Sequence, residues 1–401
     1  MKVLYIHPAG AFGGASKSLI ELYTLLKQHS VEGYVITPKG NAREAFELAG
    51  LKTISIVGLS QLDNTRFSYY RNFRWLILLR ELYYFPFSLF ALWRVKKLGI
   101  NFDLIHVNEI TLLPVGIMAK ILFKLPVIFH IRSLQRNDKH SFRSKLVFML
   151  LDKYAEAVIC IDQTVKNSIP DWMESKVVHN GINVDDVSPI SRDEIFPRKL
   201  TVGMAGMLLR SKGVYEFVEA AKILLVDRKH DLQFVIAGEN ARDAKGIVGW
   251  MYKKVGFSED VFSEIKKYIE DNELGQHVRL TGLVKDIRQI YQSIDILCFP
   301  SYLNACGRPV FEAAFYAIPS IVAIKDPHED AIINEVTGLT IDKPNPQLLA
   351  NAIEKLVMNP TLRYELGKQG KCWAEKFYSA ETNVKLALQI YNSVIETSKV
   401  P

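Results

Sequence analysis

The chain has 401 residues, of which 49% are hydrophobic and 11% are aromatic, and its formal net charge is +7. This apolar content excludes a disordered protein, and the length exceeds the roughly 250–300 residues over which one core grows, so we expect two domains. The four cysteines form no C-x-x-C pair and follow no secretory signal, which favours a reduced, cytoplasmic setting without disulfides or metal knuckles.

Short apolar runs alternate with segments of helical spacing through the first half of the chain. Helical spacing marks residues 16–28 and 43–49. The predicted strands are residues 2–7, 34–37, 53–57, 104–107, 127–130 and 157–161. Continuous apolar strands alternating with helices predict a doubly wound, mostly parallel sheet.

Residues 75–93 form an apolar stretch that is almost long enough to cross a bilayer. A span needs about 20 mostly apolar residues, and Arg80 and Glu81 near the middle of this stretch would be costly there. Pro86 would also break a helix. The stretch therefore predicts two shorter helices, partly buried in the domain and partly available to an interface.

Two basic stretches in the first half are interleaved with aromatic residues. Residues 66–97 hold seven Lys or Arg against one Glu, and residues 132–153 hold six against two Asp. This mixture suits an anionic membrane surface. We expect no nucleic-acid partner, because no helix-turn-helix, zinc or RNA-binding motif accompanies the charge. A solvated basic face without a partner is the alternative.

The strand and helix pattern restarts after a polar segment at residues 188–197. The strands predicted in the second half are residues 200–205, 233–237, 278–281, 294–299 and 320–323. We therefore expect an N-terminal domain at 1–190, a C-terminal domain at 198–378 and a last helix at 379–401. Ligands of open α/β sheets bind at the carboxyl ends of strands, so a cleft between the two domains is the expected site. Residues 241–276 predict a long irregular element that ends in a charged helix, and no chemistry attaches to it.

The stretch from Cys298 to Pro319 is the most informative part of the chain. It predicts the end of a buried strand, a loop turning on Gly307, and a helix with Glu312 in its first turn. A helix N-terminus after a glycine loop offers free backbone N–H groups to an anion. Glu312 is placed to accept hydrogen bonds from a sugar diol. This is the outline of a nucleotide-sugar site.

The same stretch resembles the signature P-S-x-x-E-x-x-G-x-x-x-x-E-A of retaining GT-B glycosyltransferases of family 4 (glycosyl transferases group 1). Glu312 matches the second Glu of the signature, and Asn304 replaces the first. The resemblance implies two Rossmann-like domains facing across a cleft, the first for the acceptor and the second for the nucleotide sugar. It also implies a last helix that crosses back to the first domain.

Three further motifs match the family. Gly13 and Gly14 match the glycine loop beside the donor diphosphate, and His130 matches a histidine that hydrogen-bonds the donor sugar or the acceptor. In the loop from Gly206 to Gly213, Lys212 stands where the family places the lysine that grips the donor phosphates. The arginine that normally follows Gly206 is Met207 here, and Arg210 is the candidate for the missing charge.

The resemblance also assigns the remaining donor-binding residues. Leu283 and Val284 would hold the nucleobase through backbone groups, and Glu312 would accept the ribose hydroxyls. The backbone N–H groups of Ala305, Cys306 and Gly307 would meet the diphosphate or the sugar, with Arg308 as a further cation. Asn304 would face the transferred sugar without the family's negative charge, which places the donor's identity in question.

The function that this implies is transfer of a sugar from a UDP- or GDP-sugar to an acceptor hydroxyl, with retention at the anomeric carbon and with His130, Lys212 and Glu312 as catalytic residues. The basic and aromatic surface favours a lipid-linked or membrane-proximal acceptor in polysaccharide or glycolipid synthesis, and a peripheral position on the inner face of the membrane. The sequence shows no D-x-D loop and no cluster of histidines, so we expect no metal and no cofactor. A non-catalytic nucleotide-sugar-binding protein or partner subunit is the main alternative, and a nucleotide-sugar epimerase is the lesser one.

Overall fold

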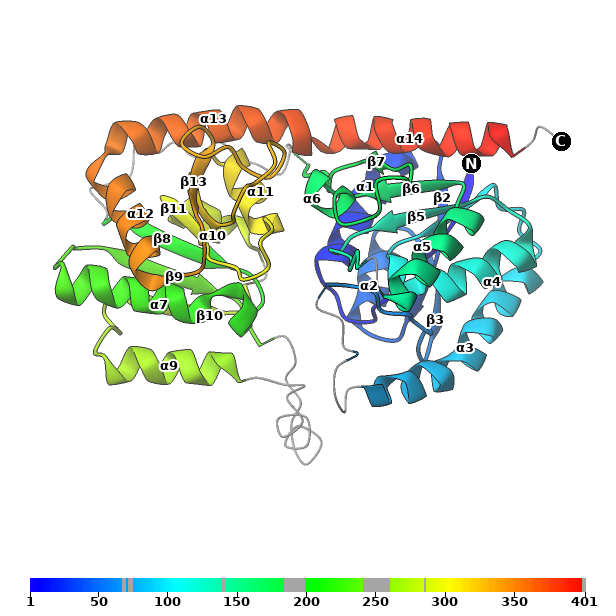
Figure 1. Ribbon diagram of the computed structural model, residues 1–401, viewed down its shortest axis with the longest axis horizontal. Helices are drawn as coiled ribbons and strands as arrows, with labels where there is room; N and C mark the ends of the chain where they lie inside the picture. The colour runs from blue at the N-terminus through cyan, green and yellow to red at the C-terminus, as the bar shows by residue number, and fades with distance from the viewer. Residues whose placement is uncertain are drawn as a thin grey trace. The chain divides into compact units, whose positions relative to one another are not determined.

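The computed structural model describes residues 1–66, 70, 75–138, 141–183, 199–240, 260–284 and 286–398. The expected linker at 188–197 and residues 241–259 of the expected irregular element lie outside these ranges, as do three basic residues of the first half, Arg71, Arg74 and Lys139. The chain divides into two compact units (Figure 1). Unit 1 comprises Met1–Asn183 and Tyr378–Pro401, and unit 2 comprises Val184–Phe377.

The sheet of unit 1 has seven parallel strands in the order β3-β2-β1-β4-β5-β6-β7. The strands are β1 (Lys2–Ile6), β2 (Glu32–Pro38), β3 (Lys52–Ile56), β4 (Leu104–Val107), β5 (Val127–Ile131), β6 (Ala157–Cys160) and β7 (Lys176–Val177). The six strands predicted for this half are all present. The strand β7 was not predicted, because two residues are too few to show a periodicity.

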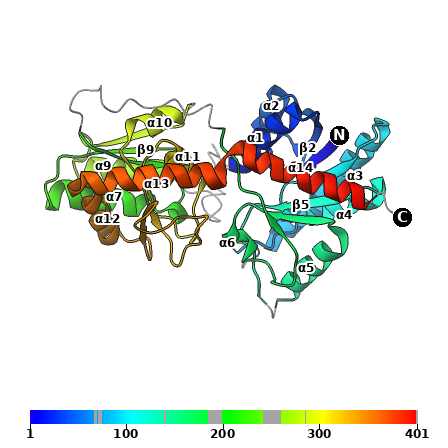
Figure 2. The same ribbon diagram turned by 90° about the horizontal axis from the view of Figure 1, so that it is seen from above.

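Helices cover both faces of this sheet. The helices are α1 (Gly14–Gln28), α2 (Asn41–Leu48), α3 (Ile77–Lys97), η2 (Ile110–Leu112), α4 (Leu113–Phe123), α5 (Phe142–Tyr154), α6 (Gln163–Lys166) and α14 (Ala380–Thr397). Figure 2 shows α1 and α2 on one side of the strands and α5 on the other. One core joins α1, α2 and α14 to the sheet, and the other joins α3, α4 and α5 to it.

Helix α3 is a single helix of 21 residues, so the prediction of two shorter helices was wrong. Pro86 lies inside it. Polar contacts fix the inner face of α3: Glu81 Oε2 accepts a hydrogen bond from Gln61 N at 2.6 Å, and Ser88 Oγ accepts one from Ser60 N at 2.9 Å. These contacts lie on both sides of the proline, and together with core packing they outweigh its helix-breaking cost of about 3 kcal/mol.

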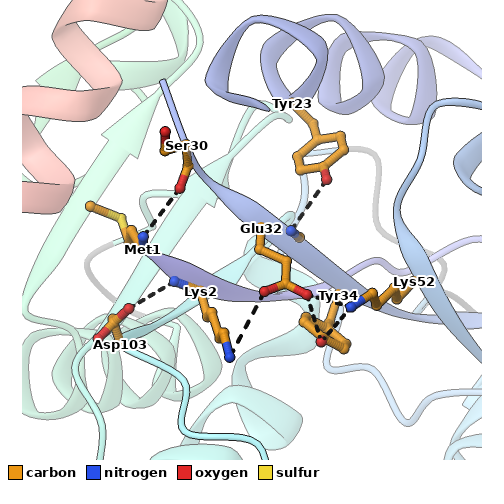
Figure 3. A network of polar contacts seen from close by, with 9 residues as sticks. Met1, Lys2, Tyr23, Ser30, Glu32, Tyr34, Lys52 and Asp103 are labelled. Carbon is orange, nitrogen blue, oxygen red and sulfur yellow. Dashed lines mark hydrogen bonds and ion pairs between the residues drawn. The ribbon is translucent and has the colours of Figure 1, made fainter. Parts of the chain in front are cut away.

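Ion pairs close the amino edge of the sheet in unit 1 (Figure 3). Glu32 on β2 forms an ion pair with Lys52 on β3. Glu32 Oε1 also accepts a hydrogen bond from Tyr34 Oη at 2.9 Å. Lys2 Nζ lies 3.9 Å from Glu32 Oε2, and the backbone N–H of Lys2 donates a hydrogen bond to Asp103 Oδ2 at 2.7 Å. Charged side chains at this edge are therefore paired with one another, and the candidate site lies at the opposite edge.

The sheet of unit 2 has six parallel strands in the order β10-β9-β8-β11-β12-β13. The strands are β8 (Thr201–Ala205), β9 (Gln233–Ala237), β10 (Val278–Gly282), β11 (Ile296–Phe299), β12 (Ser320–Ala323) and β13 (Gly338–Ile341). The helical elements are η4 (Arg210–Lys212), α7 (Val214–Lys222), η5 (Ile223–Asp227), α9 (Val261–Asp271), α10 (Arg288–Ser293), α11 (Arg308–Phe315), α12 (Pro346–Met358) and α13 (Pro360–Tyr378). All five predicted strands are present, and β13 was not predicted.

Both sheets run outward in two directions from a central pair of strands. The order reverses between β1 and β4 in unit 1 and between β8 and β11 in unit 2. In open α/β sheets ligands bind outside the carboxyl ends of the strands at such a reversal. The loops after these four strands are therefore where the fold itself favours a binding site.

Candidate active site

In unit 2, Lys212 occupies the loop that leaves β8 at the reversal point. It ends the short η4 turn, and Gly213 follows in a left-handed conformation with φ of 77°. The Lys212 Nζ atom lies over the ring of Phe299, 5.1 Å from its centroid. Burial lowers the pKa of this ammonium, and within the described residues no carboxylate acts on it. A half-buried cation without a counter-ion is suited to receive an anionic ligand.

Phe299, the last residue of β11, places Lys212 beside the loop of Gly307. A Cβ built on Gly307 would come within 2.4 Å of the Phe299 ring, so only glycine lets the loop approach this closely. Gly307 is the N-cap of α11, and the cap lacks a side-chain hydrogen bond. Gly307 therefore packs on the same ring as the Lys212 ammonium. It lies at the N-terminus of a helix whose second residue, Pro309, has no N–H and whose third residue, Val310, donates its N–H to Gly307 O at 3.0 Å. No signal in the sequence indicates that Phe299 joins the two.

Asn304 makes contacts that explain why it is an amide. Its φ is 48°, a left-handed conformation that asparagine tolerates. Its Oδ1 accepts a hydrogen bond from Lys325 N at 2.7 Å, and its Nδ2 donates to Lys325 O at 3.4 Å. A carboxylate could accept the first bond but could not donate the second. The residue that departs from the family signature thus fixes the loop to the end of β12.

Glu312 lies one turn inside α11, and its predicted place in the first turn of that helix was wrong. It is 8% exposed. Its Oε2 accepts from Tyr291 Oη at 2.7 Å, and its Oε1 accepts from Arg308 Nε at 2.7 Å. Arg308, predicted as a further cation beside the phosphates, is paired with Glu312. Both side chains hold the helix N-terminus, and a sugar diol would share the carboxylate with them.

Arg210, the candidate for the missing charge, is occupied as well. Its Nη2 forms an exposed ion pair with Glu264 on α9, and its guanidinium lies over the ring of Tyr215 at 4.5 Å. Tyr215 Oη also donates to Glu264. An exposed pair of this kind is weak, so Arg210 is available to a ligand only if Glu264 releases it.

Close backbone approaches shape the ends of β8, β9 and β10. Gly206, with φ of 132°, donates its N–H to Ala237 O at 2.9 Å, and a Cβ on Gly238 would come within 1.9 Å of Gly206 O. Gly238 N donates to Gly282 O at 3.0 Å. Leu283, directly after Gly282, is 70% exposed, and Val284 is half-buried. The predicted base-binding pair thus stands at the same carboxyl edge as Gly206 and Lys212.

In unit 1, the glycine loop follows β1 and starts α1. Gly13 is the N-cap of α1 and has extended backbone angles, and Gly14 is the first helical residue. A Cβ added to either glycine would meet no heavy atom within 4 Å. Packing among the described residues therefore does not require glycine at either position, and a ligand could approach the backbone closely here.

His130 on β5 is 2% exposed and belongs to a buried polar network at the same edge. Its Nδ1 lies 3.3 Å from Arg132 Nη2. Arg132 also donates to Asn180 Oδ1 at 2.6 Å and to Asn108 Oδ1 at 2.7 Å. Asn108 Nδ2 lies 2.8 Å from His7 Nδ1. The network thus links the ends of β1, β4 and β5.

The Nε2 atom of His130 is buried and has no hydrogen-bond partner among the described residues. Burial and then the Arg132 charge lower the pKa of His130, so its imidazole is neutral. His130 and Arg132 line a pocket within unit 1. The other residues that line it are Ser18, Leu22, Val178, His179, Asn180, Gly181, Ala380, Asn383 and Val384. A neutral imidazole with an unused nitrogen at a pocket is suited to bond a hydroxyl.

Glu109, which the sequence analysis did not identify, follows β4 at the reversal point. Its carboxylate accepts from Ile110 N at 2.8 Å and caps η2. Burial raises the pKa of Glu109 to about 7, against the opposing effects of Ile110, Ser133 and Arg132. Asn108, Glu109 and Arg132 could have been found from one signal, which is their position within two residues after the end of a predicted strand.

Two family models match nearly the whole chain. The model of glycosyl transferases group 1 matches residues 190–373. The model of glycosyltransferase family 4 matches residues 12–186.

Individual relatives agree with these models. The capsular polysaccharide biosynthesis glycosyltransferase CapM of Staphylococcus aureus is 21% identical over 309 residues, covering 71% of this chain and 75% of that protein. A D-inositol 3-phosphate glycosyltransferase of Corynebacterium jeikeium is 24% identical over 309 residues, covering 70% of each chain.

Solved structures show the same fold. Anabaena Alr3699/HepE, crystallised with UDP, has a TM-score of 0.74 at 17% identity and covers 98% of this chain and 100% of its own. A glycosyltransferase of Rickettsia africae has a TM-score of 0.72 at 17% identity and covers 98% of both chains. With two doubly wound parallel sheets and family models matching both halves, the chain belongs to the GT-B glycosyltransferases of the group 1 and family 4 type.

Proposed function

We propose that this glycosyltransferase moves a sugar from a nucleotide-diphosphate donor, a UDP- or GDP-sugar, to an acceptor hydroxyl, with retention at the anomeric carbon and without a metal or other cofactor. The observation that carries the proposal is the Lys212 ammonium, half-buried over Phe299 with no carboxylate partner among the described residues, beside Gly307 at the N-terminus of α11. Both features favour the negative charge that develops on a departing diphosphate. The related HepE structures contain UDP and UDP-glucose, which supports a uridine nucleotide first.

The proposed acceptor side is unit 1. The neutral His130 and the pocket it lines offer hydrogen bonds to a hydroxyl. The leaving phosphate oxygen can take the acceptor proton, so the reaction needs no strong protein base. We assign the acceptor to the lipid-linked or membrane-proximal class, on the strength of the basic and aromatic surface of unit 1.

The test is ligand-dependent thermal stabilisation, followed by assay of transfer. UDP, GDP, ADP and CMP are compared, each with magnesium and with EDTA. We expect one uridine or guanosine diphosphate to raise the melting temperature equally under both conditions. A rise that EDTA abolishes would overturn the metal-independent part of the proposal.

The alternative is a non-catalytic binding protein, and Asn304 in place of the family's carboxylate favours it. Two variants separate this alternative from the transferase. Lys212→Ala and Glu312→Ala should each reduce nucleotide release in the presence of acceptor. Unchanged transfer in both variants would refute the site assignment. Nucleotide stabilisation without release from the wild-type chain under any donor would support the binding protein.

A further inference from the structure

Helix α3 carries apolar side chains on its outer face as well as on its inner face. Its inner face holds Glu81, Ser88, Ala91, Leu92 and Val95, all buried. A surface helix of a globular protein is normally polar on the side away from the core. The outward side of α3 and of the turn before it is instead apolar: exposed are Trp75, Leu76, Leu79, Leu82, Tyr83, Phe85, Leu89, Phe90 and Trp93.

These side chains form one continuous stripe. Counted from Leu79, the outer residues Leu82, Tyr83, Pro86 and Phe90 stand three, four, seven and eleven positions later, the spacing of one helix face. Pro86 is exposed within the stripe. Individual exposed leucines are ordinary, but a contiguous row of this length marks an interaction surface.

The charged residues of α3 indicate the binding partner of the stripe. Its C-terminal end carries Arg94, Lys96 and Lys97, and the Lys97 Nζ atom lies 3.9 Å from the centroid of the Trp93 ring. The single carboxylate of α3, Glu81, is 6% exposed and is paired with Arg80 at 2.5 Å, so it does not repel anions outside. An apolar stripe with tryptophans near both ends and cations at one end suits the interface of an anionic bilayer.

The surface is suited to lying on a membrane rather than crossing it. Within the described part of the chain, no helix is long and apolar enough to span a bilayer. Neighbouring helices also expose apolar side chains: α3 packs against α4, and α4 packs against α5. Ile121 on α4 and Phe142 and Met149 on α5 are each more than half exposed.

We propose that the outer stripe of α3, from Trp75 to Lys97, docks unit 1 onto the surface of an anionic lipid bilayer, with the aromatic and leucine side chains in the headgroup and acyl boundary. Membrane docking extends the proposed function. It depends on that function only in its link to a membrane-proximal acceptor. The docking itself needs no catalysis, so its failure and the failure of the transferase assignment are separable.

The test is sedimentation of the full chain with vesicles of equal parts phosphatidylglycerol and phosphatidylcholine, compared with phosphatidylcholine alone. We expect binding to the anionic vesicles. The double variant Leu79→Glu with Leu82→Glu should partition about a hundredfold more weakly. Lys97→Gln should lower binding to the anionic vesicles about fivefold. Leu48→Glu is the matched control, because Leu48 on α2 is 89% exposed and lies outside the stripe.

Two further measurements keep the result interpretable. Each variant should retain the wild-type melting temperature and the wild-type stabilisation by nucleotide, which shows that both units are folded. Tryptophan emission should shift to the blue on vesicles, and Trp93→Phe should reduce that shift. The proposal is overturned if the double variant binds as well as wild type. It is also overturned if the wild-type chain binds no anionic vesicle, and light scattering then shows whether the stripe pairs two copies of the chain instead.

Discussion

The Nη2 atom of Arg132 lies 3.3 Å from the Nδ1 atom of His130. A guanidinium can only donate hydrogen bonds, so Nδ1 of His130 must accept, and the proton of the neutral ring is carried on Nε2. That nitrogen is the buried one without a partner in the described structure. Arg132 therefore positions His130 as a hydrogen-bond donor through Nε2.

Replacing Arg132 tests this positioning role. Arg132→Gln should lower kcat of transfer by about ten- to hundredfold, the value of one charge-assisted hydrogen bond. Because the Arg132 charge helps to hold down the pKa of His130, its removal raises that pKa, and the acid limb of the pH–rate profile should move to higher pH. Arg132→Lys should restore the profile in part. An unmoved profile with reduced activity would indicate a structural role only.

Lys212 and Arg210 occupy one loop and should differ in effect. Lys212→Ala should lower kcat by about a hundred- to a thousandfold, since it removes the cation proposed to meet the diphosphate, on which no carboxylate acts among the described residues. Arg210→Ala breaks an exposed ion pair with Glu264 and should change stability by less than about 1 kcal/mol and activity little. Lys266→Ala, on the exposed face of α9, is the control. Equal losses at Lys212 and Arg210 would mean that Glu264 releases Arg210 to the donor.

Alanine substitutions at the loop glycines should differ in effect, according to the atoms that the added methyl group would contact. Gly13→Ala and Gly14→Ala meet nothing within 4 Å, so they should leave the melting temperature unchanged while raising the KM for the donor. Gly307→Ala meets the Phe299 ring and should destabilise unit 2 by about 1–3 kcal/mol. The measurements are thermal unfolding and initial rates against donor concentration. An unchanged KM for both N-terminal variants would remove that loop from the donor site.

Variants of Asn304 test whether the amide, which replaces the family's glutamate, has a structural role. Asn304→Ala removes both bonds to the Lys325 backbone and should cost about 1–3 kcal/mol of stability. Asn304→Asp keeps the acceptor and loses only the longer bond, so its cost should be smaller. Denaturant titration of the variants checks this. If the alanine variant is as stable as wild type but no longer transfers, the amide serves the sugar instead.

Three buried histidines make unit 1 sensitive to acid. Burial, followed by the Arg132 charge, lowers the pKa of His7 and of His106 to about 3 from 6.5, and it lowers the pKa of His130 as well. The unfolded chain binds these protons first, so stability falls as the pH drops below about 6.5, by about 1.4 kcal/mol per pH unit for each histidine.

Glu109 acts with the opposite sign. Its pKa is raised to about 7, so the unfolded chain ionises first and stability falls as the pH rises from 4.5 toward 7. The histidines outnumber it, and the melting temperature should drop between pH 7 and pH 5. His106→Gln should make this dependence shallower, and Glu109→Gln should make it steeper. Identical slopes in both variants and the wild type would refute the assignment.

Local patterns in the amino-acid sequence are enough to predict the two sheets and most of the loops at the candidate site. Buried parallel strands are continuous apolar runs, and glycine loops that directly follow them are local signals, so the sequence alone assigns Gly13, Lys212 and Gly307 to loops at strand ends. Such patterns depend on residues that are close together in the chain. They do not predict contacts between residues that are far apart in it.

Which groups are free and which are paired depends on the tertiary fold. Arg210, Arg308 and Glu312 bond to protein partners, whereas Lys212 does not within the described residues. Asn108 and Arg132 meet because β4 and β5 are adjacent in the sheet. Pro86 stays inside α3 because contacts distant in sequence outweigh its local preference. Pairing and burial arise from residues far apart in the chain, and these set the pKa values and the unused hydrogen bonds on which the chemistry depends.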